Sequence, residues 1–268
     1  MEWAAAGGIL KLLLGVAIAV PLAFYFLQDR LIFQPQPLAE ARHAQITQRF
    51  SSVEDLFLRA ADGTRLHAWH LKGEPLVLYF GGNAEEVSWM VAEAAANAPG
   101  TGWLLIDYRG YGASEGAPSE SALVADAMQW LDHARDKLGS QKIVIFGRSL
   151  GTGIAVQLAA ARAVSGVILV APYDSLTKVG QHHYPFLPVG LMLKHPFDSV
   201  QRAPQIAAPL LCLVAAHDEV VPIVHSKRLF EAWKGPKRWV ELTDAGHNST
   251  DDAPPFWRAI REFLVQSH

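Results

Sequence analysis

Residues Ile143–Ala160 read IVIFGRSLGTGIAVQLAA and carry the clearest fold signal in the chain. Four apolar residues at the start are typical of a buried strand, and the small residues at the end predict a helix. Ser149 lies between the two, flanked by Gly147 and Gly151. A strand that passes directly into a helix has room beside the turn only for small residues, so the central side chain is exposed. The stretch therefore predicts a G-x-S-x-G nucleophile elbow with Ser149 at its tip.

A serine hydroxyl becomes a nucleophile only beside a base, and that base needs an acid to orient it. Asp218 follows an apolar run in the stretch VAAHDEVVP, and His247 follows the next predicted strand in LTDAGHNST. The carboxyl ends of parallel strands meet at one edge of a sheet. We therefore predict a catalytic triad of Ser149, Asp218 and His247, with His247 as the general base.

Other acids and histidines offer alternatives. Asp174, at the end of the preceding predicted strand, is the second candidate for the acid, whereas Asp244 fits a turn. His182 and His183 lie in the connection after the stretch APY and are assigned to the surface or to a cap. A histidine pair can bind metal, but no third residue follows at a metal-ligand spacing, so no metal site is predicted.

Apolar runs and helix-like segments alternate along the chain. Predicted strands cover residues 56–60, 62–73, 76–80, 103–107, 142–146, 166–172, 210–216 and 238–242. Predicted helices cover residues 84–97, 119–138, 150–163, 224–234 and 254–266. This pattern predicts an α/β fold with a mostly parallel eight-stranded sheet covered by helices on both faces.

Composition limits the possible functions. The 268 residues are half apolar and 18% charged, which suits one large domain. The net charge is -3 and the basic residues form no long run, so nucleic-acid binding is not expected. Cys212 is the only cysteine, which excludes an intrachain disulfide and a multi-cysteine metal site. Its place in an apolar run predicts a buried residue.

An apolar segment near the N-terminus, Ile9–Leu27, contains one charged residue, Lys11. A helix of about 20 residues spans the hydrocarbon layer of a bilayer. Trp3 and Tyr25 suit interfacial positions, and Pro21 would kink the helix without preventing a span. We predict a single-pass membrane anchor over residues 1–30, which leaves residues 31–268 as the catalytic domain.

A cleaved secretory signal is the alternative for this segment. The small residues AIA at 17–19 resemble a cleavage site, but the apolar run continues for eight more residues and the basic flank is poor. After the segment, QPQPLAEARHAQ at residues 34–45 reads as a polar linker. Arg30 and Arg42 follow the segment and only Lys11 precedes its centre, which favours a cytoplasmic catalytic domain.

Several short motifs together resemble the α/β-hydrolase superfamily of serine hydrolases. They are GGN, DYRGYGASEG, GRSLG, APYDSL, HDEVVP and AGH, and the resemblance covers about residues 30–266. They are most similar to the N-terminally membrane-anchored branch that includes eukaryotic protein depalmitoylases and many uncharacterised bacterial relatives. Two departures stand out: many relatives have His-Gly where this chain has Gly81-Gly82, and many have glycine where Ala215 stands.

The resemblance implies further site residues. The oxyanion hole needs backbone N–H donors, which we assign to Asn83 and Leu150. Gly82 would let the backbone approach the substrate, and Tyr108 and Tyr173 would line the pocket. The charged residues of DYRGYGASEG are expected to hold that loop together.

The segment from Tyr173 to Pro204 is too long for an ordinary connection. Its apolar, proline-rich stretch HHYPFLPVGLMLKHPF predicts a small cap over the site, or a surface that dips into a bilayer. A plain packed helix is the alternative.

These patterns predict a membrane-tethered serine hydrolase that cleaves carboxylic esters or thioesters through an acyl-enzyme, with no metal or organic cofactor. The expected partners are a small or lipid-like acyl substrate and the lipid bilayer. Two alternatives remain: a peptidase or amidase that uses the same triad, and a membrane-bound binding protein without turnover.

Overall fold

An eight-stranded sheet forms the centre of the computed structural model, in the strand order β1-β2-β4-β3-β5-β6-β7-β8. The strands are β1 Val53–Arg59, β2 Arg65–Leu71, β3 Leu76–Phe80, β4 Gly102–Ile106, β5 Ile143–Arg148, β6 Gly166–Val170, β7 Leu210–Ala215 and β8 Lys237–Leu242. β2 pairs antiparallel with β1 and β4, and all pairs from β4 to β8 are parallel. The structure describes the backbone of residues 2–266 and the side chains of residues 11, 15, 16 and 19–266.

The central strands are buried on both faces. Every residue of β3, β4, β6 and β7 is buried, as continuous apolar runs in a covered parallel sheet require. Alternate side chains enter opposite cores: Leu78 and Ile145 pack on one face, and Tyr79 and Phe146 on the other. The predicted mostly parallel sheet is confirmed.

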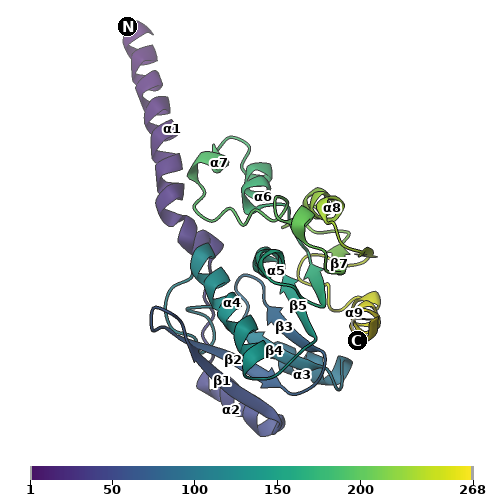
Figure 1. Ribbon diagram of the computed structural model, residues 1–268. Coiled ribbons are helices and arrows are strands. Elements are labelled where there is room, and N and C mark those ends of the chain that lie inside the picture. The colour runs from purple at the N-terminus through teal and green to yellow at the C-terminus, as the bar shows by residue number, and fades with distance from the viewer. Residues whose placement is uncertain (1, 267–268) are drawn as a thin grey trace.

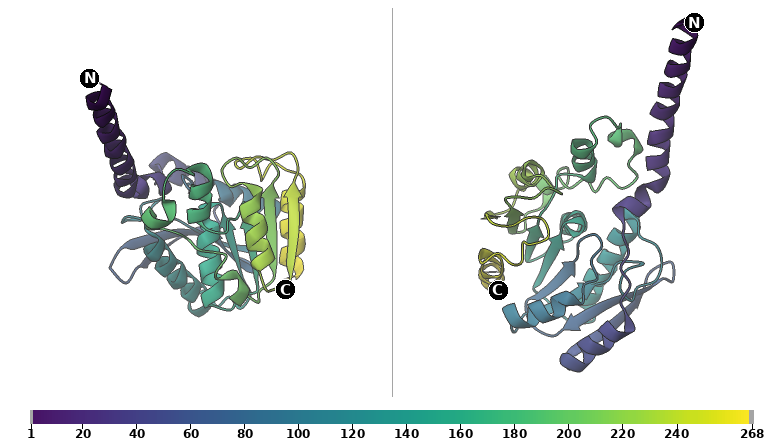
Figure 2. Two further views of the ribbon diagram at one scale, coloured as in Figure 1. Left: turned by 90° about the horizontal axis from the view of Figure 1, so that it is seen from above. Right: turned by 180° about the vertical axis from the view of Figure 1, so that it is seen from behind.

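Helices cover both faces of the sheet (Figures 1 and 2). They are α1 Glu2–Ile32, α2 Glu40–Arg49, α3 Trp89–Asn97, α4 Glu120–Asp136, α5 Leu150–Ala161, α6 Leu176–His183, α7 Val189–Met192, α8 Ile223–Ala232 and α9 Pro255–Gln266. Apolar residues of α4, α5 and α8 join one core, and those of α2, α3 and α9 join the other. This double layer fixes the strand ends where functional residues are expected.

Two local predictions are wrong. Residues 34–45 are not a plain linker, because α2 begins at Glu40 and buries Ile46 in a core. The helix predicted over 84–97 begins only at Trp89, because Ala84 has a φ of 56° and the chain turns back before entering α3. That turn belongs to the loop that lies against Ser149.

α1 is a 31-residue helix that projects away from the sheet, as Figures 1 and 2 show. The predicted span over Ile9–Leu27 falls partly on side chains outside the described residues. In the part of the chain that is described, no helix is both long and apolar enough to cross a membrane. Such a span is thus not found here.

The segment 173–204, called the cap segment below, contains α6 and α7 and contacts the end of α1. The Gln28 amide donates to Met192 O at 3.0 Å and accepts from Lys194 N at 2.7 Å. His195 Nε2 lies 3.0 Å from Asp29 Oδ1. These contacts join the cap segment to the base of α1, and Figure 1 shows α7 beside that helix.

Candidate active site

Ser149 occupies the turn between β5 and α5 with φ 48° and ψ -114°. A residue with a Cβ adopts this region only at a cost of about 1–3 kcal/mol. Hydrogen bonds to the neighbouring backbone hold it there: Ser149 N donates to Val170 O at 2.9 Å, and Thr152 donates to Ser149 O from both N and Oγ1. The turn predicted from the sequence therefore has a strained backbone at the serine.

The glycines around Ser149 allow close approach of the backbone. A Cβ on Gly151 would overlap Phe80 O of β3, and one on Gly147 would overlap the backbone of α5. A Cβ on Gly153 would overlap the ring hydroxyl of Tyr173. Any larger residue would move α5 away from the sheet, so these positions need glycine for space rather than for backbone freedom.

Three side chains from three strand ends meet at this turn. Ser149 Oγ lies 2.9 Å from His247 Nε2, in the loop after β8. His247 Nδ1 lies 2.8 Å from Asp218 Oδ2 and 3.0 Å from Oδ1, in the loop after β7. The Nδ1–H tautomer of His247 donates to Asp218 and leaves Nε2 free to accept the serine proton. The structure thus brings together the three residues predicted from the sequence, with His247 within hydrogen-bonding distance of both Ser149 and Asp218.

Asp218 is held as an acceptor from several sides. Its Oδ1 also accepts Val220 N at 2.9 Å and Val221 N at 2.7 Å. Its side chain is 1% exposed, whereas that of His247 is 12% exposed. A buried carboxylate with fixed donors orients the imidazole, and the imidazole still reaches solvent and substrate.

The alternative residues lie elsewhere. Asp174 Oδ1 lies 2.8 Å from His225 Nδ1. His183 Nε2 meets Val220 O at 2.9 Å, and the His182 ring packs on His225. In the described part of the chain, no group of three or more His, Cys, Asp or Glu side chains could hold a metal ion.

Residues 81–85, called the glycine loop below, follow β3 and reach Ser149. A Cβ built on Gly82 would lie 3.6 Å from Ser149 Cβ. The Asn83 side chain is held within the fold, because its Oδ1 accepts Gln34 N and Ala84 N, both at 2.9 Å. Within residues 2–266, the backbone N–H groups of Asn83 and Leu150 donate to no acceptor. Both donors predicted for an oxyanion hole are therefore free.

The two predicted pocket tyrosines are buried below this surface. Tyr108 is 5% exposed and donates to Gly81 O at 2.7 Å. Tyr173 is 1% exposed and donates to Leu150 O at 3.1 Å. The two hydroxyls thus bind backbone carbonyl groups of the glycine loop and of the residue after Ser149. A direct contact of these tyrosines with substrate stays a prediction.

The loop after β4 is held by buried charges, as predicted. Arg109 forms a bidentate pair with Asp126 at 2.6 and 2.7 Å. Asp107 Oδ2 lies 2.7 Å from Nδ1 of His67, a fully buried histidine of β2 that also meets Asp55 at 3.0 Å. The sequence analysis did not identify His67, because the sequence of a strand does not show which carboxylates will contact a histidine within it.

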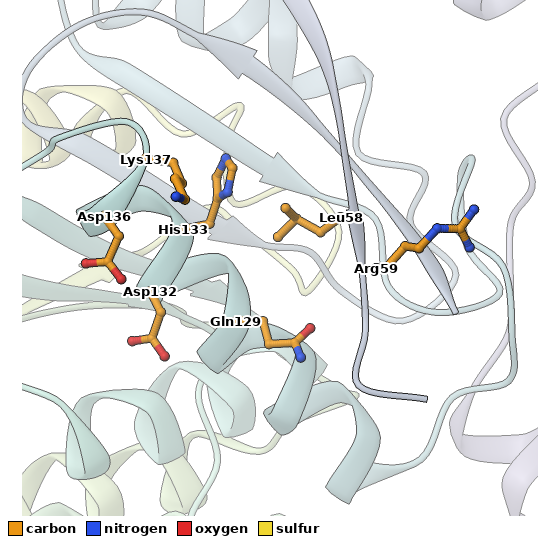
Figure 3. A pocket seen from close by; sticks show the side chains of 7 residues that line it. All are labelled: Leu58, Arg59, Gln129, Asp132, His133, Asp136 and Lys137. Carbon is orange, nitrogen blue, oxygen red and sulfur yellow. The ribbon is translucent and has the colours of Figure 1, made fainter. Parts of the chain in front are cut away.

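Two hollows lie away from the triad. The hollow in Figure 3, of about 260 Å³, is lined by Leu58 and Arg59 of β1 and by side chains at the C-terminal end of α4. Figure 3 shows Asp132, His133 and Asp136 along the α4 side. A second hollow, of about 480 Å³, lies at the end of α5. Neither includes a triad residue.

Comparisons with known proteins place the chain in a family. A family described as alpha/beta hydrolase fold matches residues 75–194. The alpha/beta hydrolase domain-containing protein WAV2 of Arabidopsis thaliana is 31% identical, over 93% of this chain and 91% of that protein. The chain belongs to the α/β-hydrolase family. The uncharacterized protein Rv2307c of Mycobacterium tuberculosis is 37% identical to this α/β hydrolase, over 94% and 92% of the two chains.

A further relative and two solved structures complete the comparison. The uncharacterized membrane protein YNL320W of Saccharomyces cerevisiae is 30% identical to this α/β hydrolase, over 96% of each chain. An alpha-beta hydrolase from Vibrio vulnificus superimposes with a TM-score of 0.73 at 21% identity, over 90% and 92% of the chains. The Pyrococcus furiosus esterase Pf2001 gives a TM-score of 0.68 at 19% identity, over 87% and 98%. The structural matches share the fold.

Proposed function

We propose that this α/β hydrolase is a serine hydrolase that cleaves carboxylic esters or thioesters. One observation carries the proposal: Ser149 Oγ, His247 and Asp218 form a continuous hydrogen-bonded line, with distances of 2.9 and 2.8 Å. Nucleophile, base and orienting acid are the parts that acyl transfer needs.

The reaction follows from these positions. His247 Nε2 takes the proton as Ser149 Oγ attacks the acyl carbonyl, and Asp218 stabilises the resulting imidazolium. The N–H groups of Asn83 and Leu150 stabilise the oxyanion of the tetrahedral intermediate. His247 then protonates the leaving alcohol or thiol, which leaves an acyl-enzyme on Ser149. Water, activated by His247, releases the acid and restores the serine.

We propose in addition that α1 tethers the hydrolase to a lipid bilayer. Val16, Leu22, Phe26, Leu27 and Leu31 are each about half exposed or more. At 100° per residue these side chains spread over about half of the helix circumference, which makes a wide apolar surface that suits contact with lipid. The yeast relative named as a membrane protein supports the same reading. Arg30 and Arg42 favour the cytoplasmic face.

The cap segment extends this apolar surface. Its exposed residues Tyr184, Phe186 and Leu191, called the cap tip below, have 52, 96 and 90% of their surface exposed. The Tyr184 ring lies 5.7 Å from that of Phe24 on α1. Exposed aromatic and aliphatic side chains beside a tethering helix suit insertion among lipids, which favours an acyl chain as part of the substrate.

Active-site labelling tests the proposed chemistry. A fluorophosphonate probe should label the wild-type chain and fail to label Ser149→Ala. A chain-length series of p-nitrophenyl esters and thioesters, compared with aminoacyl amides, then identifies the bond and the acyl group. Hydrolysis of amides alone would assign a peptidase, and a wild-type serine that stays unlabelled would assign a binding protein.

A further inference from the structure

We infer that Glu85 is a positioning residue that holds the glycine loop ready to stabilise the oxyanion. This inference rests on the proposed function of Ser149. The Glu85 carboxylate accepts Gly82 N at 2.6 Å, within the loop that carries the Asn83 N–H. Ala84, with its φ of 56°, turns the chain so that Glu85 folds back onto Gly82. An acidic side chain therefore clamps the backbone directly beside the nucleophile.

Three donors from three elements converge on this carboxylate. Besides Gly82 N, Tyr79 Oη of β3 donates to Oε1 at 2.6 Å, and Trp89 Nε1 of α3 donates to Oε1 at 2.9 Å. Burial, and then the negative charge of Glu85, raise the pKa of Tyr79 well above its usual value, so the phenol keeps its proton. A side chain that faces donors only must be an acceptor only, which a carboxylate is and an amide is not.

The glycines of the loop make room for this carboxylate. A Cβ on Gly81 would lie 3.0 Å from Glu85 Cδ, and one on Gly82 would lie 3.2 Å from Oε2. The carboxylate thus packs flat against the loop backbone. A side chain at position 81 or 82 would crowd the Glu85 carboxylate. This contact explains why glycine suits position 81 in this chain.

Arg148, the residue before the nucleophile, joins the same network. Its side chain is 14% exposed, lies 5.4 Å from the Trp89 ring centroid and pairs with Asp251 at 3.2 Å. The charge of Glu85 is among those that Arg148 faces. Trp89 therefore links the two residues, because its Nε1 donates to Glu85 and its ring lies against Arg148 at the strand end that presents Ser149.

Glu85 affects catalysis through the Asn83 N–H, the donor that follows Gly82 in the loop. The Gly82 N–H is taken by Glu85, which fixes the loop backbone at the residue that lies against Ser149, and the N–H of the next residue, Asn83, remains free. An oxyanion forms only along the reaction, so a loosened donor weakens the transition state more than the bound substrate. Loss of Glu85 should therefore lower kcat and leave KM nearly unchanged.

Glu85→Gln tests this inference on the full-length chain. The amide keeps the shape but turns an N–H toward one of the three donors. We expect kcat for a p-nitrophenyl ester to fall about 10- to 100-fold, below the loss for removing an oxyanion donor outright, with KM within about threefold. The Ki of an alkyl boronic acid, which forms a tetrahedral adduct on serine, should rise by the factor by which kcat/KM falls.

Glu86→Gln is the matched control. Glu86 is the next residue and accepts Ser88 N at 2.9 Å and Ser88 Oγ at 2.6 Å, without contacting Gly82. It should lower the thermal midpoint and leave kcat and the boronate Ki unchanged. Should Glu85→Gln fail to fold, Tyr79→Phe removes one donor from the carboxylate and should cost about 3- to 10-fold in kcat.

The outcomes separate the two proposals. Equal kcat in wild type and Glu85→Gln, or equal losses in Glu85→Gln and Glu86→Gln, would overturn the role of Glu85 and leave the serine hydrolase intact. A wild-type chain that neither labels nor turns over esters would overturn the proposed function and, with it, this inference.

Discussion

Asp174 Oδ1 and His225 Nδ1 lie 2.8 Å apart, both almost fully buried, in a pair that excludes His247. Arg228 adds a second contact to the same carboxylate at 3.2 Å. The acid that follows β6 is therefore fully engaged in binding α8 to the sheet. His247 meets only the acid that follows β7, which separates the two candidates for the orienting residue.

Replacement of Asp218 should lower the rate of hydrolysis, whereas replacement of Asp174 should lower the stability of the fold. Asp218→Asn should reduce kcat about 10⁴-fold, because the amide favours the wrong tautomer of His247. Asp174→Asn should keep kcat within a few fold and lower the free energy of unfolding by about 1–3 kcal/mol, because His225 loses its buried partner. Ester kinetics and urea unfolding of both variants measure the difference. Normal turnover in Asp218→Asn with loss in Asp174→Asn would reassign the acid.

The nucleophile and the base should act as a unit. Ser149→Ala and His247→Ala should each remove most of a roughly million-fold rate advantage, and the double variant should lose little more. Single-turnover ester hydrolysis, with the thermal midpoint as a check on folding, measures the three rates. Losses that multiply in the double variant would mean that the two residues act independently.

The folded state should lose stability from His67 as the pH rises. Burial alone lowers the pKa of His67, but hydrogen bonds to Asp107 and Asp55 and their charges outweigh it, so the pKa is raised above 6.5. A group whose pKa is higher in the folded state than in the unfolded state stabilises the folded state fully at pH values below its unfolded-state pKa. This stabilisation is lost as the pH rises through the folded-state pKa. The unfolding free energy of wild type minus that of His67→Gln should shrink as the pH rises above about 6.5.

His133 provides a control of opposite sign. Its pKa is lowered, first by burial and then by the neighbouring His70 and Lys137 side chains. Its contribution is therefore present above its unfolded pKa and lost as the pH falls. The difference between wild type and His133→Gln should grow as the pH rises toward about 6.5 and then level off, whereas the difference for His67→Gln shrinks above that pH. Parallel trends in the two variants would contradict the assignment.

Gly151 should tolerate no side chain. In Gly151→Ala the new Cβ would overlap Phe80 O and lie 2.7 Å from Gly81 O. We expect a loss of about 1–3 kcal/mol or more in unfolding free energy, together with lower kcat, because α5 or the glycine loop must shift. Gly190→Ala is the control, since its Cβ would make an ordinary 3.7 Å contact with Thr177 Cγ2. Equal stability of the two variants, by urea unfolding, would count against this packing.

The cap tip should contribute to lipid binding. Phe186→Ser with Leu191→Ser should lower the fraction of protein that floats with phosphatidylcholine vesicles and leave hydrolysis of a short soluble ester unchanged. Val265→Ser is a matched control, because Val265 is 67% exposed on α9, away from α1 in Figure 2. Unchanged flotation of the double variant would remove the cap tip from the membrane surface.

Periodicity predicted the strands well, because covered parallel strands are continuous apolar runs. β5 and β7 begin within one residue of their predicted positions. It failed at α2, whose only buried residue is Ile46, so that the helix lacks an apolar stripe long enough to read. Periodicity also placed the start of a helix at Ala84. The sequence pattern does not show that the Glu85 side chain folds back onto the backbone of its own loop.

The predicted site residues follow the same logic. Ser149, Asp218 and His247 could be found because each stands just after an apolar run, where strand order brings chain-distant loops together. Glu85 and His67 could not, because their roles depend on several donors or carboxylates from separate elements. Tyr108 and Tyr173 were assigned to the pocket by resemblance, and only packing reveals that their hydroxyls hold Gly81 O and Leu150 O.

The line from Ser149 to His247 joins residues 98 positions apart, and the histidine follows β8, the last strand to be synthesised. A nascent or proteolysed fragment that stops before this strand carries the serine with no imidazole to accept its proton. The proposed hydrolysis therefore requires a chain that extends through His247.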